Sequence, residues 1–401
     1  MSEHRHAAGL ISIPTAREEG LALIATSPCI SCSGVLVNSL EFDTPVTTVT
    51  SDCRPWNLPL QLGQCSACGF VQSILDDEWR ESSQEIYRSY DSYFQSSSKD
   101  QLVFSSGVSE SRTQVFVNAT LEAIDLPAGA RVLDFGCGSG NVLRALSRVR
   151  PDLRLDGFDL DTRAESTLRC IPNFESLYSE IPPSSGEYHL VVFSHSLEHL
   201  ERPALTLHQM TKVLAKGGHV AIALPDCSKD PIKLAVADHC SHFSPQSLTL
   251  WLKESGLEAR TLPAGTASRE CLVVALPSSK IGETPSPSRD LWFFDAAAWL
   301  QKAVTQLRNA SRQPLTGVFG TSISAAWILA QEPQLARFFV DEDSARNRTF
   351  HKRVVYNVDS VPKGHRVLVP FAGEHLTSLL DRLRGFRPDV IWSGLHEIGR
   401  T

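Results

Sequence analysis

Residues 131–143, RVLDFGCGSGNVL, decide the fold that this sequence predicts. An apolar run of β type leads to Asp134, glycines follow at alternate positions, and the apolar spacing then becomes that of a helix. Glycines permit a tight turn and a close approach of a ligand to backbone N–H groups, and a helix N-terminus favours partial negative charge. The stretch therefore predicts a strand, a ligand-binding loop at Gly136, Gly138 and Gly140, and a helix.

The alternation of β-type and helical segments continues after this loop. The runs LRLDGFD, HLVVFSH and HVAIALP are each followed by a helical pattern, which favours a parallel sheet with crossover helices. Two β-type runs at 257–262 and 270–276 then follow each other without a helix, so we expect an antiparallel hairpin at one edge of the sheet. The predicted fold class is α/β, with a doubly wound core.

The chain of 401 residues exceeds the length at which one hydrophobic core usually keeps growing, so we expect several domains. Changes of composition and pattern along the chain set their boundaries. The predicted parts are a loose N-terminus at 1–25, a cysteine-rich module at 26–75, a helical bridge at 76–125, the core at 126–276, a Pro- and Ser-rich linker at 277–290, and a smaller α/β domain at 291–401.

The composition disfavours several classes of partner. A formal net charge of −7 gives no electrostatic footprint for broad nucleic-acid binding. No apolar run approaches the ~20 residues that span a bilayer, and the first residues lack the apolar core of a secretion signal. We therefore expect a cytoplasmic protein without a nucleic-acid or membrane partner. The oligomeric state stays open.

An acidic residue follows the second predicted strand, in LRLDGFDLD. Asp159 lies about 20 residues after the glycine loop, where a carboxylate can accept hydrogen bonds from both hydroxyls of a ribose. Asp156 and Asp161 are alternatives nearby. A ligand that carries a nucleoside is therefore expected, although glycine loops also occur in dinucleotide-binding proteins.

The segments VLDFGCGSG, GFDLD, EYHLVVFSHSLEHL and KVLAKGGHVAIALPD, taken in this order, resemble the motifs of class I S-adenosylmethionine-dependent methyltransferases, which have a Rossmann-like fold. The resemblance covers residues 110–276. It implies that Asp134 and the three glycines surround the methionine part of the cofactor and that Asp159 holds its ribose. It also implies that Ser194 and His195 meet the cofactor at the end of the fourth strand. The alternative is a nucleotide-binding domain that does not methylate.

Four of the ten cysteines form two CxxC pairs, Cys29 with Cys32 and Cys65 with Cys68. Each pair can supply two thiolate ligands from a tight turn. Together the four thiolates predict one tetrahedral, structural zinc site. The segment is too poor in apolar residues to fold without a cross-link. Cys53 lies between the pairs as a possible substitute ligand, and unliganded core cysteines are the alternative.

The order of these parts resembles that of sugar-nucleotide C-methyltransferases: an N-terminal CxxC pair, a tyrosine-bearing bridge, the methyltransferase core and a C-terminal α/β domain. In that family a loop after the fifth strand carries a tyrosine and then a glutamate and histidine in tandem, with the histidine as base. The resemblance implies that His239 is the general base and Asp238 its neighbouring carboxylate. This chain has Val236 at the tyrosine position and His242 where an aromatic residue is usual, so methylation of carbon and of oxygen both stay open.

Further candidates stand outside this loop. Tyr87 and Tyr90, with Tyr93, share one side of a predicted helix, where they either bind the acceptor or simply pack. His195 and His199 flank Glu198 and either act on the acceptor or shape the cofactor loop. The C-terminal unit has only Gly320 where a dinucleotide site needs three glycines, so an independent NAD site is not expected. The resemblance implies that this unit closes over the sugar nucleotide, and a purely structural lid or a dimer surface is the alternative.

The function predicted on these grounds is methylation of a sugar nucleotide or glycan intermediate, with S-adenosylmethionine as the methyl donor and zinc as a structural ion. The first alternative is methylation of another small metabolite or of a protein. The second is a binding module that retains the cofactor fold without catalysis.

Overall fold

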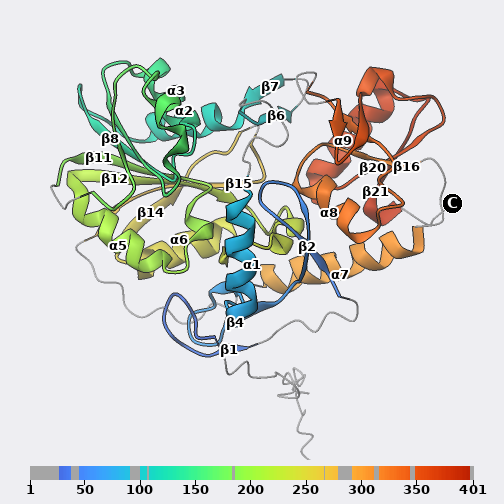
Figure 1. The fold of residues 1–401 in the computed structure, drawn as a ribbon, viewed down its shortest axis with the longest axis horizontal. Coiled ribbons are helices and arrows are strands. Elements are labelled where there is room, and N and C mark those ends of the chain that lie inside the picture. The colour runs from blue at the N-terminus through green and yellow to red at the C-terminus, as the bar shows by residue number, and fades with distance from the viewer. Residues whose placement is uncertain are drawn as a thin grey trace, which may run out of the picture.

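The computed structural model describes residues 27–37, 45–90, 100–105, 108–182, 186–265, 267–278, 291–310, 316–343 and 348–397. Two α/β lobes lie side by side, and the N-terminal module lies between them (Figure 1). The loose N-terminus expected at 1–25 and most of the expected linker, 279–290, fall outside the described residues.

The core lobe contains a seven-stranded sheet in which all strands but one, β15, run in the same direction. The last two strands of this sheet in chain order, β14 and β15, form the antiparallel hairpin that the sequence predicted at one edge. The edge strand β10 was not predicted, because its side chains are half-exposed and lack the apolar signal of its neighbours. The spatial order is β10 (Phe174–Tyr178), β9 (Arg154–Phe158), β8 (Arg131–Phe135), β11 (Tyr188–Ser194), β12 (Leu214–Pro225), β15 (Glu270–Pro277) and β14 (Leu257–Thr261).

Helices cover both faces of this sheet, as a doubly wound fold requires. Helices α2 (Arg112–Ala123) and α3 (Asn141–Val149) pack on the face that contains Val192. Helices α5 (Pro203–Val213) and α6 (Pro245–Glu254) pack on the opposite face, which contains Val191. Consecutive residues of one strand thus enter two different cores, because side chains alternate across a sheet.

The N-terminal module is completed by a strand from the core lobe. Strands β1 (Leu36–Val37), β4 (Leu62–Cys65) and β5 (Val71–Ser73) are antiparallel, and β13 (Ser241–His242) pairs with β5. A second hairpin joins β2 (Thr47–Val49) and β3 (Pro55–Pro59). The segment expected to be a loop of the core at 238–242 therefore belongs in part to the sheet of another module.

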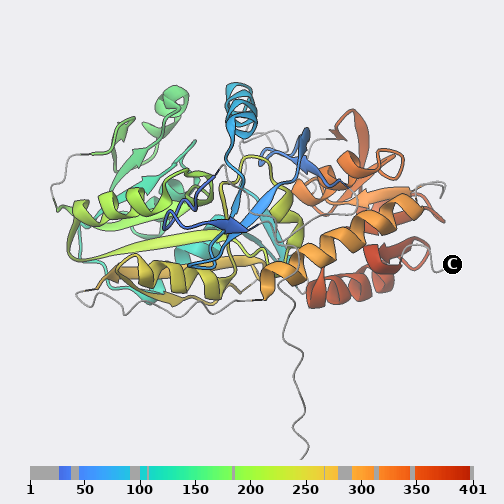
Figure 2. The same ribbon diagram turned by 90° about the horizontal axis from the view of Figure 1, so that it is seen from below.

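Among its described residues, the bridge predicted as helical at 76–125 is helical only at its two ends. Helix α1 (Asp77–Arg88) stands out from the core sheet in Figure 2, and α2 forms the other end. Between them β6 (Leu102–Ser105) and β7 (Val108–Ser111) pair as a hairpin. The run LVFSSGVSES at 102–111 combines β-branched and aromatic residues around a Ser-Gly pair, a composition that favours strands over a helix.

The C-terminal unit is a second parallel α/β fold. Its six-stranded sheet has the order β18 (Thr349–Phe350), β19 (Arg353–Asn357), β17 (Phe339–Asp341), β16 (Thr316–Phe319), β20 (Arg366–Val369) and β21 (Ile391–Gly394). Only the pair β18–β19 is antiparallel. The helices are α7 (Trp292–Ala310), α8 (Ile323–Gln331) and α9 (Gly373–Phe386). The sequence analysis missed β18, β19 and β21.

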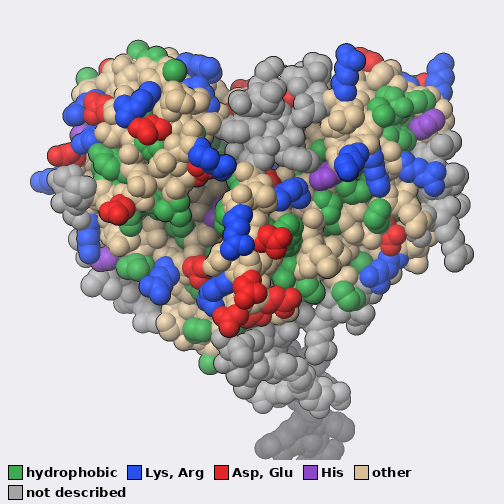
Figure 3. Space-filling model, viewed as in Figure 1, with side chains coloured by type: hydrophobic (Ala, Val, Ile, Leu, Met, Phe, Trp, Pro, Cys, Tyr) green, Lys and Arg blue, Asp and Glu red, His purple; other side chains and the backbone are tan. Residues whose placement is uncertain are grey.

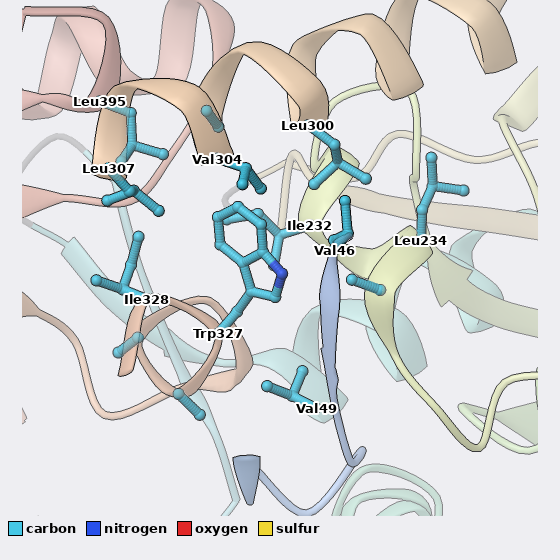
Figure 4. Close-up of a cluster of buried hydrophobic side chains, with 14 of the residues drawn as sticks. Val46, Val49, Ile232, Leu234, Leu300, Val304, Leu307, Trp327, Ile328 and Leu395 are labelled. Carbon is cyan, nitrogen blue, oxygen red and sulfur yellow. The ribbon is translucent and has the colours of Figure 1, made fainter. Parts of the chain in front are cut away.

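One buried cluster joins all three parts of the chain (Figure 4). Trp327 of α8 is fully buried at its centre. Around it lie Val49 from the N-terminal module, Leu300 from α7, and Ile232 from the short 3-10 helix η3 (Pro231–Ala235) of the core lobe. The loop that begins with η3 is therefore anchored at both ends, in this cluster and in the N-terminal sheet.

Candidate active site

The glycine loop has the backbone conformation that its sequence predicts. Gly136, Gly138 and Gly140 all have positive φ angles, of 79°, 50° and 85°, a region that other residues rarely adopt. A Cβ atom on Gly136 would lie 2.6 Å from the Cβ of Ser196, and one on Gly140 would lie 2.5 Å from Leu168 Cδ2. The loop therefore requires glycine for conformation and also for space.

Asp134, at the start of this loop, fits a positively charged ligand. It is 2% exposed, and its Oδ1 has no hydrogen-bond partner among the described residues. Burial, and next the charge of Asp159, raise the pKa of Asp134 to about 8. An orphaned buried carboxylate is costly unless a ligand pairs with it. S-adenosylmethionine supplies a sulfonium and an ammonium group, so this donor set fits the cofactor.

Of the three candidate aspartates in and after β9, Asp159 is the one that contacts the glycine loop. Its Oδ2 accepts a hydrogen bond of 2.8 Å from the N–H of Gly138, and further lone pairs of the carboxylate remain for a ribose. Asp156 is instead buried against Arg131, with a distance of 2.6 Å from its Oδ2 to Nε. Asp161 accepts a bond from Arg163 N as the cap of a 3-10 helix. These contacts give both alternatives structural roles.

Ser194 ends strand β11, and His195 follows it in a left-handed conformation with φ 53°. Such a conformation is strained for a residue other than glycine and is typical of functional sites. His195 Nε2 lies 3.1 Å from Glu270 Oε2. Burial and Arg112 oppose protonation, but Glu270 and Glu198 outweigh them, so the pKa of His195 is raised. Sequence reasoning missed Glu270 and Arg112, because no motif marks them.

The three residues predicted as catalytic are all buried at the carboxyl edge of the core sheet. Asp238, His239 and His242 are 0%, 3% and 2% exposed. Burial, and next the neighbouring His199 and His242, hold the pKa of His239 well below its usual value, so its imidazole is neutral and can accept a proton. Burial lowers the pKa of His242 to about 3. His242 lies in β13, with Nε2 3.4 Å from Ser73 Oγ.

Both predicted tyrosines are linked to this loop by hydrogen bonds, Tyr87 through His199 and Tyr90 through Ser51. The Tyr87 hydroxyl lies 2.9 Å from His199 Nδ1, and the Tyr90 hydroxyl lies 3.2 Å from Ser51 Oγ. Ser51 in turn hydrogen-bonds to Asp238. Burial, and next the charge of Asp238, raise the pKa of both phenols, which therefore stay protonated. Tyr93 lies outside the described residues.

The two CxxC pairs come together as one cluster of sulfur atoms. All four Sγ atoms lie within 4.8 Å of one another, with Cys29 3.7 Å from Cys68 and Cys32 3.5 Å from Cys65. Zinc–thiolate bonds of ~2.3 Å in a tetrahedron place sulfurs about 3.8 Å apart, so the geometry fits zinc. Cys53, the possible substitute, lies in a different cluster.

Comparison with known proteins agrees with the core geometry. Residues 110–262 match a family described as a methyltransferase domain. The chain is 26% identical, over 170 residues, to a ubiquinone biosynthesis O-methyltransferase of Xanthomonas axonopodis pv. citri, a match that spans 36% of this chain and 67% of the relative. It is 28% identical over 116 residues to a trans-aconitate 2-methyltransferase of Paracidovorax citrulli, spanning 28% of this chain and 45% of the relative.

Among solved structures, a SAM-dependent methyltransferase from Aquifex aeolicus is 21% identical, with a TM-score of 0.35 over 41% of this chain and 91% of that one. The family match and the named relatives support a class I S-adenosylmethionine-dependent methyltransferase domain at residues 110–262. The chain spans two thirds of the first curated relative and less than half of the second.

Two surface features bear on partners. Among the described helices, none combines the length and apolar character that a membrane crossing requires. Lys and Arg side chains are interspersed with Asp and Glu on the face shown in Figure 3, rather than gathered into the basic stripe typical of nucleic-acid binding.

Proposed function

We propose that this protein transfers the methyl group of S-adenosylmethionine to a sugar nucleotide or glycan intermediate. The observation that carries the proposal is the position of His239. It lies beside His199 and Glu198, and the Oε1 of Glu198 is 3.5 Å from Nδ1 of His195 at the end of β11. A neutral, buried imidazole thus stands at the carboxyl edge of the sheet near the cofactor loop, where ligands of α/β folds bind.

His239 removes the acceptor's proton in this proposal. As the acceptor's oxygen or carbon attacks the methyl carbon in line with the sulfur, the new bond to methyl forms and the carbon–sulfur bond breaks. The proton passes to the imidazole, and S-adenosylhomocysteine leaves. Val236, which stands at the position of the family's tyrosine, has no hydroxyl and is buried in the cluster around Trp327. Tyr87 and Tyr90 are the phenols near His239 that could take its place. We propose that they contact the acceptor.

The relatives support a small-molecule acceptor, since their names refer to ubiquinone biosynthesis and trans-aconitate. The sugar nucleotide rests on the domain order, and the C-terminal unit supports it. Asp341 at the end of β17 accepts bonds of 2.8 and 2.7 Å from the N–H and hydroxyl of Thr321. Arg269 of the core lies 4.2 Å over the ring of Phe371. The contact between Arg269 and Phe371 holds the carboxyl edge of the C-terminal sheet against the core lobe. In that position the C-terminal unit can cover the acceptor.

Zinc at Cys29, Cys32, Cys65 and Cys68 completes the proposal as a structural ion. A bound ion would fix the turn after β4, and β4 holds β5, which pairs with β13 of the candidate catalytic loop. The ion would therefore stabilise that loop without touching the acceptor.

Incubation with methyl-labelled cofactor and separate panels of nucleotide sugars, quinols, carboxylic acids and proteins tests the acceptor class. We expect label in a nucleotide-sugar product. Label in a quinol, a carboxylate or a protein would replace the sugar nucleotide by that class, and tight cofactor binding without transfer to any panel would favour the non-catalytic alternative.

A further inference from the structure

Three potential metal ligands that the sequence analysis did not combine lie together beside the candidate base. They are Glu198 and His199, from the short turn after β11, and His239, from the loop after β12. One ligand atom of each lies within 4.8 Å of the others. Glu198 is 2% exposed and His239 is 3% exposed, so this cluster is interior, unlike the acidic groups common on protein surfaces.

Glu198 carries a carboxylate that lacks a partner. Neither of its oxygens has a hydrogen-bond partner among the described residues. The nearest cationic nitrogen is Nδ1 of His195, at 3.5 Å from Oε1, beyond an ordinary hydrogen bond. A buried carboxylate left in this state is costly, and a bound cation is one of the few groups that offset the cost.

The two imidazoles are arranged as metal ligands usually are. Nδ1 of His199 lies 3.0 Å from the carbonyl oxygen of Asp238 and 2.9 Å from the hydroxyl of Tyr87. A hydrogen bond on one ring nitrogen fixes the ring and leaves the other as the ligand. His239 contributes the second imidazole, with one ring nitrogen within 4.8 Å of the ligand atoms of Glu198 and His199.

We propose that Glu198, His199 and His239 bind a divalent transition-metal cation such as Mn²⁺ or Zn²⁺. Two imidazoles and one carboxylate suit such ions and leave coordination positions open. Ligand atoms around one ion stand about 3 to 4 Å apart, and the three ligand atoms here all lie within 4.8 Å of one another. The site differs in chemistry from the four thiolates, which select softer ions.

The catalytic role of the cation rests on the proposed function. Within that function, the cation would favour a hydroxyl oxygen as the atom that is methylated. The cation, when bound, would supply Lewis-acid chemistry that lowers the pKa of the acceptor hydroxyl, so that its proton would pass to solvent water. The acceptor oxygen would then attack the methyl carbon as the carbon–sulfur bond breaks, giving a methyl ether and S-adenosylhomocysteine. In the metal-loaded protein His239 is a ligand, and the cation takes over the task that His239 performs as a base in the metal-free protein.

Titration of full-length protein that carries one equivalent of zinc, at the four cysteines, with Mn²⁺, followed by the electron paramagnetic resonance signal of free Mn²⁺, tests the site. We expect one further equivalent to bind. Glu198→Gln, which keeps the side chain's shape, should weaken Mn²⁺ binding more than about ten-fold, and so should His239→Ala. The matched control is Glu201→Gln, three residues away, where the side chain is half-exposed and pairs with Arg80; it should bind Mn²⁺ as the wild type does.

The absence of binding beyond the zinc equivalent would overturn the proposal, as would equal binding by the Glu198→Gln and wild-type proteins at unchanged melting temperature. Because this experiment measures metal binding, its result does not depend on the acceptor assay. A protein that binds Mn²⁺ and methylates no nucleotide sugar contradicts only the proposed acceptor. A protein that methylates nucleotide sugars equally well in chelator and binds no Mn²⁺ contradicts only the metal site.

Discussion

Ser51 of the N-terminal module holds both carboxylate oxygens of Asp238, which precedes the candidate base. The backbone N–H of Ser51 donates to Oδ1 over 2.8 Å, and its hydroxyl donates to Oδ2 over 2.5 Å. Asp238 is fully buried, so these two bonds compensate a charge that would otherwise be unpaired on that side. The N-terminal module therefore positions the loop at 238–242, which carries the proposed catalytic residues.

Ser51→Ala should lower kcat about ten-fold or more while the Kd for S-adenosylmethionine stays unchanged. The reason is that a hydrogen bond to a buried charge is worth about 1.5–3 kcal/mol, and its loss acts on the loop rather than on the cofactor site. Ser51→Thr keeps the hydroxyl and should retain most activity. Equal kcat for Ser51→Ala and the wild type would show that Asp238 does not need this contact.

Binding of S-adenosylmethionine should release protons near neutral pH. With a pKa of about 8, Asp134 is roughly nine-tenths protonated at pH 7 in the free protein. The positive cofactor favours the carboxylate and lowers that pKa, so release approaches one proton at pH 7 and vanishes as the pH rises above the free-protein pKa. Calorimetry in buffers of different ionisation enthalpy measures the release. Asp134→Asn should abolish it, and buffer-independent heats in the wild type would contradict the assignment.

Cys65→Ser should remove the bound zinc and loosen the loop at 238–242. Loss of one thiolate leaves only three of the four zinc ligands. Cys65 ends strand β4, which pairs with β5, and β5 in turn pairs with β13 of the loop. Zinc content and hydrogen exchange of the loop amides are the measurements. Cys170→Ser, at an exposed cysteine outside the cluster, is the control. Undiminished zinc in Cys65→Ser would refute the site.

Trp327→Ala should destabilise the whole chain rather than the C-terminal unit alone. Its fully buried indole packs with residues of all three parts, and truncation of a buried tryptophan typically lowers the free energy of unfolding by about 3–5 kcal/mol. Denaturant unfolding followed separately in each part measures this. A transition lowered only in the C-terminal unit would show that the cluster does not couple the parts.

The core was predictable because its signals are local. Asp134, the three glycines and the apolar strands β8 and β11 lie in continuous runs, and short-range periodicity reports them directly. Asp159 could be proposed from spacing, but only the contact with Gly138 separates it from Asp156 and Asp161.

The contacts between modules were not predictable. Ser51 and Asp238 are 187 positions apart, and β13 has only two residues, too few for a strand pattern. Glu198 was visible in the sequence, but its lack of a partner is a property of burial. The hairpin at β6 and β7 was missed because the surrounding helical spacing outweighed ten residues of β type.

The central claim is that His239 and the neighbouring cofactor loop carry methyl transfer to a sugar nucleotide. Its most direct test is the rate of S-adenosylhomocysteine formation with nucleotide sugars, compared for wild-type protein and His239→Ala. The account predicts methylated sugar and equimolar S-adenosylhomocysteine from the wild type, and loss of turnover in the variant at an unchanged Kd for S-adenosylmethionine. Turnover by His239→Ala at the wild-type rate would contradict it.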